Sequence, residues 1–385
     1  MTAFAITEEQ VARIIGALSA DEMSRRFNRH FDFLTIASWT GETLIGKAGI
    51  GMSKDEIVVC AERAALFFGL DPDFLQSAET TRIADWASEV ATAIKDNLAQ
   101  FTFKSAARDE RAAACVHNAP EILQDANAVA GILQGRKRVL SMVAPHSLLG
   151  FELTILTPNL QKIDSADVRS LTPEQISKML AYGDVLVATP SLWRYLMQEN
   201  LTAPDNTMAV AFGEPMTPQL AAQMRQAGFG AMRELYGSTE TGLIGWRDAP
   251  GEDFVLFDHW KRDNGKLVRM SAAGKEHALQ AMDFLGWSGD RTFRLSGRRD
   301  GAVQIGAVNV IPDDVAQRLS QHPLVSDCIV RVGRRDDGVD RLIAHIVLKK
   351  GSQPGERIAR DIDAWCRTTL RHQERPRIYH FEEKL

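Results

Sequence analysis

The most informative run in the chain is Glu234-Leu235-Tyr236-Gly237-Ser238-Thr239-Glu240-Thr241-Gly242, which is followed by apolar residues. Small and hydroxyl-bearing residues crowd its centre, so backbone amides and two side-chain donors can meet one anion. Glu240 is suited to a bound Mg²⁺, and Gly237 and Gly242 let the backbone approach a ligand closely. The run predicts a corner that binds phosphate and metal, although ordinary surface turns are rich in the same residues.

The run resembles the YGxTE signature of the adenylate-forming superfamily, which comprises acyl-CoA synthetases, aryl-acid CoA ligases and the adenylation domains of peptide synthetases. Those enzymes join a carboxylate to AMP and then pass the acyl group to a thiol. The resemblance implies that Tyr236, Gly237 and Ser238 line the nucleotide site. It also implies that Thr239 and Glu240 hold the α-phosphate and the metal ion, with Glu240 as the metal ligand.

Composition sets the broad class of protein. A chain of 385 residues with 45% hydrophobic content is long enough for two or three domains with cores of their own. A net charge of −5 without basic runs gives no reason to expect nucleic acid or an anionic membrane surface as a partner. There is no apolar signal segment and no bilayer-spanning run. Cys60, Cys115, Cys328 and Cys366 lack metal-ligand spacing, which favours the reducing cytoplasm.

Residues 1–100 carry helical patterns. Thr7 and Gln10 have the spacing of a capping box, and apolar residues recur at helical spacing over residues 55–68, with Gly69 as the stop. Residues 82–98 form a further amphipathic pattern, with apolar side chains on one side. We therefore expect a helical N-terminal segment.

From residue 101 to 298 short apolar runs alternate with helical patterns, which is typical of a mostly parallel α/β sheet. The expected strands are 139–144, 185–188 and 208–212, and the expected helices are 173–182, 191–199 and 218–228. In open sheets of this type the ligand lies beyond the carboxyl ends of the strands. The overall prediction is an α/β protein with a helical N-terminal segment (1–100), a mixed, mostly parallel AMP-binding domain (101–298) and a small α+β lid domain (299–385).

Two loops that follow expected strands fit the same family. The first, Pro145-His146-Ser147-Leu148-Leu149-Gly150-Phe151, resembles the His-containing loop that borders the acyl pocket in aryl-acid ligases. We expect His146 to act as a wall of that pocket, although a lone histidine is more often structural. The second, Gly213-Glu214-Pro215, resembles the loop whose backbone frames the adenine.

Spacing supports the resemblance near the end of the α/β domain. Gly297-Arg298-Arg299-Asp300 resembles the family's GRxD hinge, which implies that Arg298 contacts ribose or phosphate and that Asp300 lies at the hinge. A ribose-binding aspartate lies fifteen residues before that arginine in the family, and 298 − 15 = 283 is Asp283. A carboxylate can accept hydrogen bonds from both ribose hydroxyls. Asp290 lies too close to Arg298 and is expected in a hairpin turn.

The loop Val303-Gln304-Ile305-Gly306-Ala307-Val308-Asn309-Val310 resembles the segment that the small domain brings to the active site for thioester formation. A helix over 313–320, strands over 326–332 and 341–348 and a helix over 357–370 then predict an α+β lid. The resemblance is nearest to the short 4-coumarate:CoA ligases associated with photoactive yellow protein.

Two departures from the family concern ATP. Ligases carry a loop of the form TSGSTGxPK around the outer phosphates, and this chain has Ser105-Ala106-Ala107-Arg108-Asp109-Glu110-Arg111-Ala112-Ala113 in its place. The glycines and the lysine are absent, and two acidic residues would repel a triphosphate. The C-terminal run resembles the segment before the family's catalytic lysine, and Lys384 lies too early to be that lysine.

Three hypotheses are compatible with these matches and losses. The chain is a ligase relative that makes or uses an acyl-adenylate, a degenerate ligase that acts on an acyl group already activated or by another reaction, or a noncatalytic partner of a ligase. The implied ligands are AMP, ATP or an acyl-adenylate, Mg²⁺, and CoA. The implied partners are a small carboxylic acid or acyl thioester and CoA or another thiol, with neither nucleic acid nor membrane.

Overall fold

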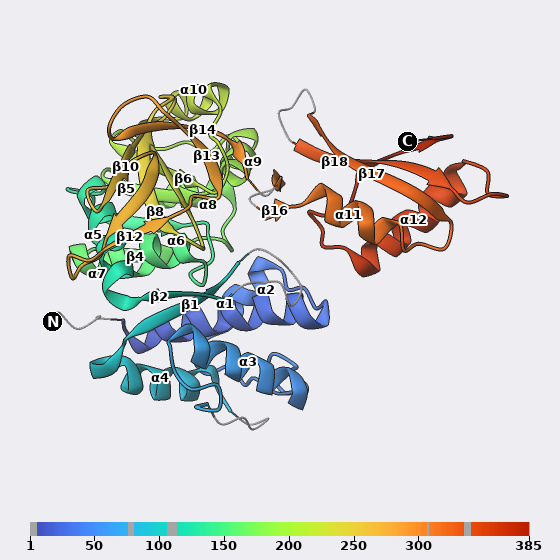
Figure 1. Ribbon diagram of the computed structural model, residues 1–385. Helices are drawn as coiled ribbons and strands as arrows, with labels where there is room; N and C mark the ends of the chain where they lie inside the picture. The colour runs from blue at the N-terminus through green and yellow to red at the C-terminus, as the bar shows by residue number, and fades with distance from the viewer. Residues whose placement is uncertain are drawn as a thin grey trace. The chain divides into compact units, whose positions relative to one another are not determined.

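The computed structural model describes residues 6–75, 81–105, 114–299, 301–305, 308–334 and 340–384. The chain divides into two units, Met1–Ala281 with Trp287–Arg294, and Met282–Gly286 with Leu295–Leu385. Figure 1 draws both, and each is described here by itself. The division passes through the hairpin of β13 (Asp283–Trp287) and β14 (Thr292–Arg298). The three-part division at residues 100 and 298 stays a prediction.

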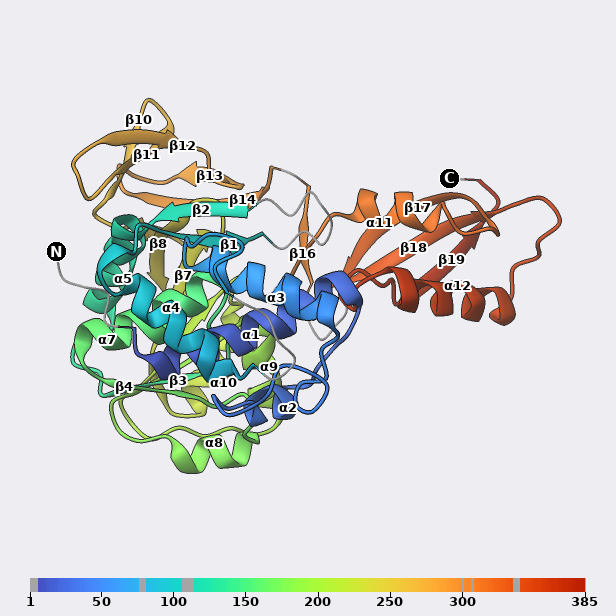
Figure 2. The same ribbon diagram turned by 90° about the horizontal axis from the view of Figure 1, so that it is seen from below.

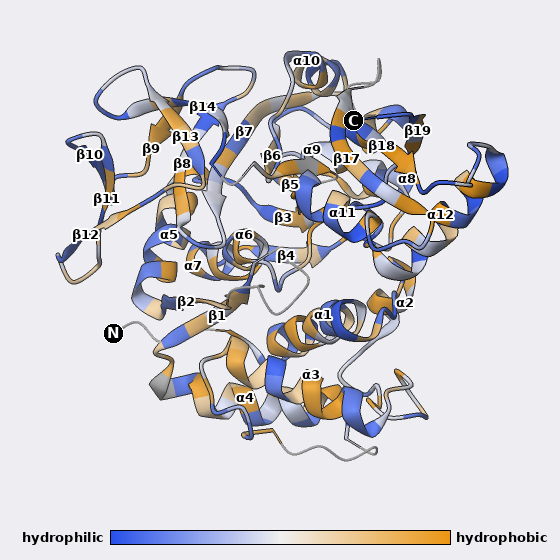
Figure 3. Ribbon diagram, turned by 45° about the vertical axis from the view of Figure 1, so that its right-hand side comes forward, coloured by the Kyte–Doolittle hydropathy of each residue, from blue (hydrophilic) through white to orange (hydrophobic). Residues whose placement is uncertain are grey.

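Helices begin the first unit: α1 (Glu8–Phe27), α2 (Phe33–Ser38), α3 (Lys54–Phe67) and α4 (Ile83–Asn97). The predicted capping box is present, because the Gln10 amide donates to the Thr7 hydroxyl and the Thr7 amide donates to the Gln10 side chain. Gly69 follows α3 with a φ of +67°, as the predicted helix stop requires. Figure 3 shows hydrophobic residues along both α1 and α3. Among the described residues no helix has the length and apolar character needed to cross a membrane.

A cluster of phenylalanine rings joins these helices to the rest of the unit. The antiparallel strands β1 (Gln100–Lys104) and β2 (Ala114–Asn118) lie between the helices and the main α/β layers (Figure 1). The ring of Phe67 on α3 lies 5.9 Å from Phe101, 5.1 Å from Phe103 and 5.5 Å from Phe151, measured between centroids. All of these rings are buried, so the helical segment shares a core with the α/β layers.

One half of the main sheet is parallel, in the order β4-β3-β5-β6-β7. Its strands are β3 (Arg138–Ser141), β4 (Asp164–Asp167), β5 (Asp184–Ala188), β6 (Thr207–Phe212) and β7 (Phe229–Ser238). The helices between and around them are α5 (Ala119–Ile132), α6 (Leu148–Phe151), a π-helix (Glu152–Leu156), α7 (Thr157–Gln161), α8 (Pro173–Met179), α9 (Pro190–Gln198) and α10 (Pro218–Gln226). Every residue of β5 and β6 is buried, as expected of strands covered on both faces. The predicted α/β class is confirmed.

The other half of the sheet is antiparallel. β8 (Gly242–Asp248) pairs with β7, β9 (Phe254–Leu256) pairs with β8, and β14 pairs with β9. A separate antiparallel sheet of β10 (Trp260–Asp263), β11 (Lys266–Met270) and β12 (Glu276–Leu279) projects beside it (Figure 2). The Trp260 indole N–H donates to the Leu243 carbonyl oxygen at 2.6 Å, which ties this small sheet to β8.

The second unit is an α+β domain, as predicted. It contains β15 (Val303–Ile305), β16 (Val308–Val310), α11 (Pro312–Leu319), β17 (Val325–Arg334), β18 (Asp340–Leu348), α12 (Glu356–Thr369) and β19 (Ile378–Glu382). β17, β18 and β19 form a sheet, and α11 and α12 cover one face of it (Figure 1). Leu319 and Ile362 from the helices and Ala344 and Ile346 from β18 are fully buried and form the centre of its core.

Candidate functional site

The predicted phosphate corner is the turn that joins β7 to β8. The two strands pair as far as Ser238 and Gly242, so the residues between them form what we call the 238–242 turn. The Ser238 Oγ lies 3.0 Å from the Thr241 Oγ1, and the Thr241 amide donates to the Ser238 carbonyl oxygen at 3.3 Å. Thr241 is buried, Thr239 is half-buried and Glu240 is exposed. The turn is thus held by its own hydroxyls, while the carboxylate is open to solvent.

The surroundings of Glu240 decide what kind of metal site it could form. In the part of the chain that the structure describes, no three His, Cys, Asp or Glu side chains gather closely enough to hold a metal ion. Mg²⁺ is commonly bound by one or two carboxylates together with the phosphates of a substrate. An exposed carboxylate on a turn fits that arrangement, in which the ligand's phosphate supplies further oxygens.

A buried ion pair lies behind the turn. The side chains of Asp125 on α5 and Arg269 on β11 are 0% and 1% exposed, and the Arg269 Nη2 lies 2.7 Å from the Asp125 Oδ1. The Asp125 Oδ2 accepts a hydrogen bond from the Leu243 amide at 3.0 Å. The Arg269 Nη1 donates to the Thr241 carbonyl oxygen at 3.4 Å. Two side chains from distant parts of the sequence therefore hold the backbone of the turn where it enters β8.

Two further contacts fix the turn. The His117 Nε2 on β2 lies 2.7 Å from the Thr239 carbonyl oxygen. Burial holds the pKa of His117 below its usual value, so the neutral ring donates this hydrogen bond at pH 7. Gly242 has a φ of +77°, and a Cβ built there would lie 2.5 Å from the Asp125 Oδ2. The turn passes so close to Asp125 that glycine is required at position 242.

Glu152 is a second carboxyl group in this buried region. It opens the π-helix, it is fully buried, and neither of its oxygens accepts a hydrogen bond from a described residue. Burial raises the pKa of Glu152 well above its usual value, and the nearby Asp125 raises it further. This shift favours the protonated form of Glu152, which leaves Asp125 as the charged partner of Arg269.

The predicted adenine loop, Gly213-Glu214-Pro215, lies beside the turn because β6 and β7 are neighbouring parallel strands. Glu214 is buried, and its carboxylate accepts hydrogen bonds from the Ser191 hydroxyl at 2.7 Å and the Arg194 Nη2 at 2.8 Å. The Glu214 side chain thus anchors the loop to α9. The backbone of the loop, rather than the Glu214 side chain, is therefore left to frame a ligand.

Tyr236 and Gly237 contribute to the packing of the sheet. The Tyr236 ring is buried, with its centroid 5.7 Å from the ring of Phe254 and 5.6 Å from that of Phe293. A Cβ built on Gly237 would lie 2.4 Å from the Gly242 carbonyl oxygen, so glycine is needed there for the turn itself. A role for either residue toward a ligand stays a prediction.

The predicted ribose residues belong to the second unit, at the outer ends of the β13–β14 hairpin. Asp283 begins β13, Arg298 ends β14, and both are half-buried. The Arg299 amide donates to the Met282 carbonyl oxygen at 2.9 Å. Asp283 and Arg298 are the neighbours of these two residues, so they lie near this hydrogen bond on adjacent strands. Asp290 lies in the turn between the strands, as predicted. Asp300, Gly306 and residues 106–113 of the altered phosphate loop lie outside the described residues.

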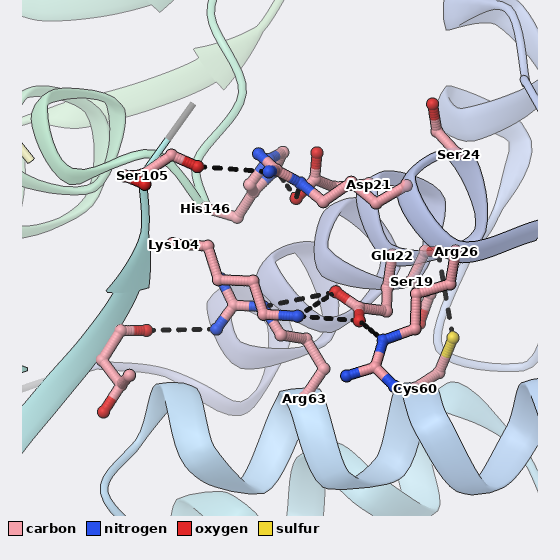
Figure 4. A network of polar contacts seen from close by, with 12 residues as sticks. Ser19, Asp21, Glu22, Ser24, Arg26, Cys60, Arg63, Lys104, Ser105 and His146 are labelled. Atoms are coloured by element: carbon pink, nitrogen blue, oxygen red, sulfur yellow. Dashed lines mark hydrogen bonds and ion pairs between the residues drawn. The ribbon is translucent and has the colours of Figure 1, made fainter. Parts of the chain in front are cut away.

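His146 follows β3 and packs against α1. Its Nε2 lies 3.8 Å from the Asp21 Oδ2 (Figure 4). Burial lowers the pKa of His146 to about 4, against the opposing effect of Asp21, so the ring is neutral at pH 7. The structure thus places His146 in a polar contact with the helical segment. Its expected place in the wall of an acyl pocket stays a prediction.

A second buried cluster of charge, centred on Glu22 of α1, lies next to His146 (Figure 4). The Glu22 side chain is 1% exposed, and both of its oxygens lie 2.7 Å from the Lys104 Nζ. Arg26 donates to Glu22 at 2.8 Å, and the Arg63 Nε lies 3.8 Å away. The Arg25 Nη1 donates to the Ser105 carbonyl oxygen at 3.1 Å. This cluster joins α1 and α3 to the end of β1.

Two cavities in the first unit lie away from the predicted residues. One of about 980 Å³ lies between α5 and the antiparallel strands, with Trp246, Phe257 and His259 in its lining. A neighbouring cavity of about 500 Å³ is lined by Glu121, Lys275 and other residues. The linings of these two cavities include none of the predicted site residues. The chemistry of the 238–242 turn, rather than cavity size, therefore identifies the candidate site.

Reasoning from the sequence missed the residues behind the turn: His117, Asp125, Glu152 and Arg269. The separation of Asp125 and Arg269 is 144 residues, so no local motif joins them. One signal was available for Asp125, which lies on the same face of α5 as the buried Ile122 and Val129. A carboxylate on an apolar helix face needs a buried partner.

Comparisons with known proteins give consistent results. Residues 314–385 match the family described as the AMP-binding enzyme C-terminal domain. The chain is 32% identical over 301 residues to a 4-coumarate–CoA ligase of Halorhodospira halophila. The aligned region covers 77% of this chain and 75% of that protein. It is 27% identical over 387 residues to a 4-coumarate–CoA ligase of Rhodobacter capsulatus, covering 97% of both.

Solved structures show the same fold. A double mutant of o-succinylbenzoate CoA synthetase from Bacillus subtilis, bound to a product analogue, superposes with a TM-score of 0.64 at 13% identity and covers 98% of this chain and 90% of that one. A malonyl-CoA ligase with methylmalonyl-CoA and AMP bound gives a TM-score of 0.59 at 16% identity. The superposition covers 74% of this chain and 71% of that one.

Proposed function

Because the chain belongs to the adenylate-forming superfamily and is an acyl- or aryl-acid CoA ligase-like protein, we propose that its 238–242 turn holds the phosphate of AMP or of an acyl-adenylate. The protein then passes the acyl group to a thiol. The observation that supports this most is the turn itself, which places the half-buried Thr239 beside the exposed Glu240, at the end of the central strand β7. Ligands of open α/β sheets bind at such strand ends.

Each predicted residue has a task in this proposal. Thr239 donates to the α-phosphate, and Glu240 holds Mg²⁺, which supplies positive charge where the phosphate becomes more negative. Donors already held in place stabilise such charge without reorganising during the reaction. The backbone of the 213–215 loop and Tyr236 frame the adenine, and Asp283 accepts from the ribose hydroxyls beside Arg298. Asp300 forms the hinge, Gly306 lies in the loop near the thiol, and His146 borders the acyl group.

The acyl donor in this proposal is a small carboxylic acid or its activated form, and the acceptor is CoA or another thiol. Since relatives are named 4-coumarate–CoA ligases, 4-coumarate is the first acid to test. We place the protein in the cytoplasm. Its cysteines are free, and burial raises the pKa of Cys60 and Cys328 to about 12 and that of Cys115 and Cys366 to about 11. The acceptor thiol is therefore expected from the partner molecule.

Calorimetric titration of the whole chain with AMP and with a nonhydrolysable acyl-adenylate mimic, each with and without Mg²⁺, tests the proposal. We expect both ligands to bind, more tightly with Mg²⁺. Thr239→Val should weaken binding about tenfold or more, because a hydrogen bond to a charged group is lost. Glu240→Gln should remove the gain from Mg²⁺. Glu174→Gln, at an exposed carboxylate on α8, serves as the control and should match the wild type.

The contrary result is a wild-type protein that binds neither ligand, or a Glu240→Gln variant with an undiminished Mg²⁺ effect. A second arm supplies synthetic 4-coumaroyl-adenylate with CoA and follows the thioester. Formation faster than in a protein-free sample supports acyl transfer, and equal rates argue against it. A parallel sample with 4-coumarate, Mg²⁺-ATP and CoA measures the adenylation step through the release of pyrophosphate.

A further inference from the structure

We propose that Asp125 and Arg269 are positioning residues, which hold the 238–242 turn in the conformation that receives a phosphate. This inference rests on the proposed function, since it concerns the same turn. The two side chains are 0% and 1% exposed. They are too deeply buried to touch a ligand, so they act through the backbone that they hold.

The polar atoms of the ion pair contact the turn, α5 and His259, whose Nε2 lies 2.9 Å from the Asp125 Oδ1. The Asp125 carboxylate bonds Arg269 through Oδ1 and the Leu243 amide through Oδ2. The Arg269 Nη2 also donates to the Glu121 carbonyl oxygen at 2.8 Å, and its Nη1 donates to the Thr241 carbonyl oxygen. Each charged group therefore contacts the turn on one side and a stable helix on the other. The pair works as a bridge between α5 and the turn.

An irregularity in the strand pairing explains why the turn needs this bridge. The β7–β8 register shifts between Tyr236 and Gly237, so one strand carries an extra residue at this point. Such a bulge interrupts the ladder and leaves backbone groups without their usual partners. The Leu243 amide lies next to this shift and donates to the Asp125 Oδ2 at 3.0 Å. Asp125 thus holds the backbone at the point where the strand pairing is irregular.

A pair of apolar side chains could fill the same space but could not form hydrogen bonds with the backbone of the turn. A buried ion pair loses the solvation of both charges, and apolar residues of similar volume often give equal stability. Apolar side chains would, however, leave the Leu243 amide and the Thr241 carbonyl without a partner in the interior. The turn would then sample several conformations, and a ligand would have to order it on binding. The expected consequence is weaker phosphate binding without a matching loss of fold.

Hydrogen exchange of the backbone amides, measured on the whole chain without ligand, tests the bridge directly. In Asp125→Asn we expect the Thr241 and Leu243 amides to exchange about tenfold faster or more, because a hydrogen bond to a charged acceptor is lost. The Kd for AMP should rise by a similar factor. The double variant Asp125→Leu with Arg269→Met removes both charges together, and it should show the same two effects with a melting temperature no lower than that of Asp125→Asn.

Asp184→Asn is the matched control. Asp184 is also a buried carboxylate that bonds an arginine, Arg138 at 2.6 Å, and a backbone amide, that of Ala181 at 2.8 Å. It begins β5, at the opposite end of the strands from the turn. Asp184→Asn should lower the melting temperature about as much as Asp125→Asn does. Exchange in the turn and the Kd for AMP should stay at wild-type values.

The proposal is overturned if the turn keeps its slow exchange in the double variant, or if Asp125→Asn changes only the melting temperature, as the control does. Failure of the wild type to bind AMP would contradict the proposed function alone. The exchange rates would still show whether Asp125 and Arg269 hold the turn. The two ideas therefore fail in distinguishable ways.

Discussion

The two buried clusters of charge in the first unit use their charges differently. Behind the 238–242 turn, the side chains of one ion pair also form hydrogen bonds with backbone groups, the Thr241 carbonyl oxygen and the Leu243 amide. Around Glu22, the charged side chains chiefly bond one another, as Lys104 and Arg26 do (Figure 4). The first arrangement fixes the shape of a loop, and the second joins two layers of the fold. The comparison shows that buried charge alone does not indicate a binding site.

The Glu22 cluster lies next to Ser105, where the altered phosphate loop begins. Lys104 and Arg25 lie at its start and carry positive charge, which would suit an outer phosphate. Both are already engaged: Lys104 by both oxygens of Glu22 and Arg25 by Asp21 at 2.7 Å. Burial also lowers the pKa of Lys104. These side chains therefore stabilise the fold rather than stand free for a phosphate.

The largest effect is expected from Glu22→Gln. The change removes a counter-charge from the buried Arg63 and the half-buried Lys104, and breaking a buried ion pair typically costs about 3–5 kcal/mol of unfolding free energy. The affinity of the folded protein for AMP should stay unchanged, because this cluster joins layers of the fold. Denaturant unfolding and calorimetry measure the two quantities. Glu174→Gln, in an exposed ion pair of the same 2.7 Å length, should leave stability almost unchanged. A large loss of AMP affinity in Glu22→Gln would contradict the division of roles.

An intermediate effect is expected from Gly242→Ala, which adds a Cβ 2.5 Å from the Asp125 Oδ2. Gly265→Ala is the matched control, since Gly265 has the same φ of +77° but nothing within 4 Å of its Cβ position. Both variants carry the backbone strain, which costs roughly 1–3 kcal/mol. Gly242→Ala alone should lose additional stability and AMP affinity. Equal behaviour of the two variants in thermal melts and titrations would show that the close approach of the turn to Asp125 is unimportant.

The smallest effect, taken per half-unit step of pH, concerns the pH dependence of stability at His146. Its pKa is lowered to about 4 in the folded protein from an ordinary value of 6.5, so the unfolded chain binds the proton more readily between these values. Stability should therefore fall as the pH drops through this window, by at most about 1.4 kcal/mol per pH unit. Asp21 also has a lowered pKa, but its contribution is lost only below 3.8.

His146→Asn should flatten the fall in stability between pH 6.5 and 4. His277→Asn, at a residue whose side chain is 39% exposed, is the control. Melting temperatures at steps of half a pH unit give the comparison. A slope in His146→Asn as steep as in the wild type would mean that another group titrates in this window.

The fold was largely predictable because local patterns determine it. The capping box at Thr7 and the apolar runs that became β5 and β6 identify their elements without knowledge of the rest of the chain. Apart from the hairpin turn at Asp290, the antiparallel strands were not anticipated, because β9 has only three residues and β10, in the separate small sheet, has only four. Such short strands carry little periodicity.

The candidate site was only partly predictable. The composition of the 238–242 turn marks it locally, through its glycines and hydroxyl groups. Its support cannot be read in the same way, since Asp125 and Arg269 meet only after α5 and β11 have packed. The raised pKa of Glu152 likewise arises from burial in the folded state. The roles proposed for Asp283, Arg298, Asp300 and Gly306 still rest on resemblance.

The most direct test of the central claim is a crystal structure of the whole chain grown with AMP and Mg²⁺. The account predicts the phosphate within hydrogen-bond distance of the Thr239 side chain and the backbone of the 238–242 turn, with Mg²⁺ bridging the phosphate and Glu240. It also predicts that Asp125 and Arg269 keep the contacts described here. Clear density for AMP elsewhere, with the turn empty, would contradict the account.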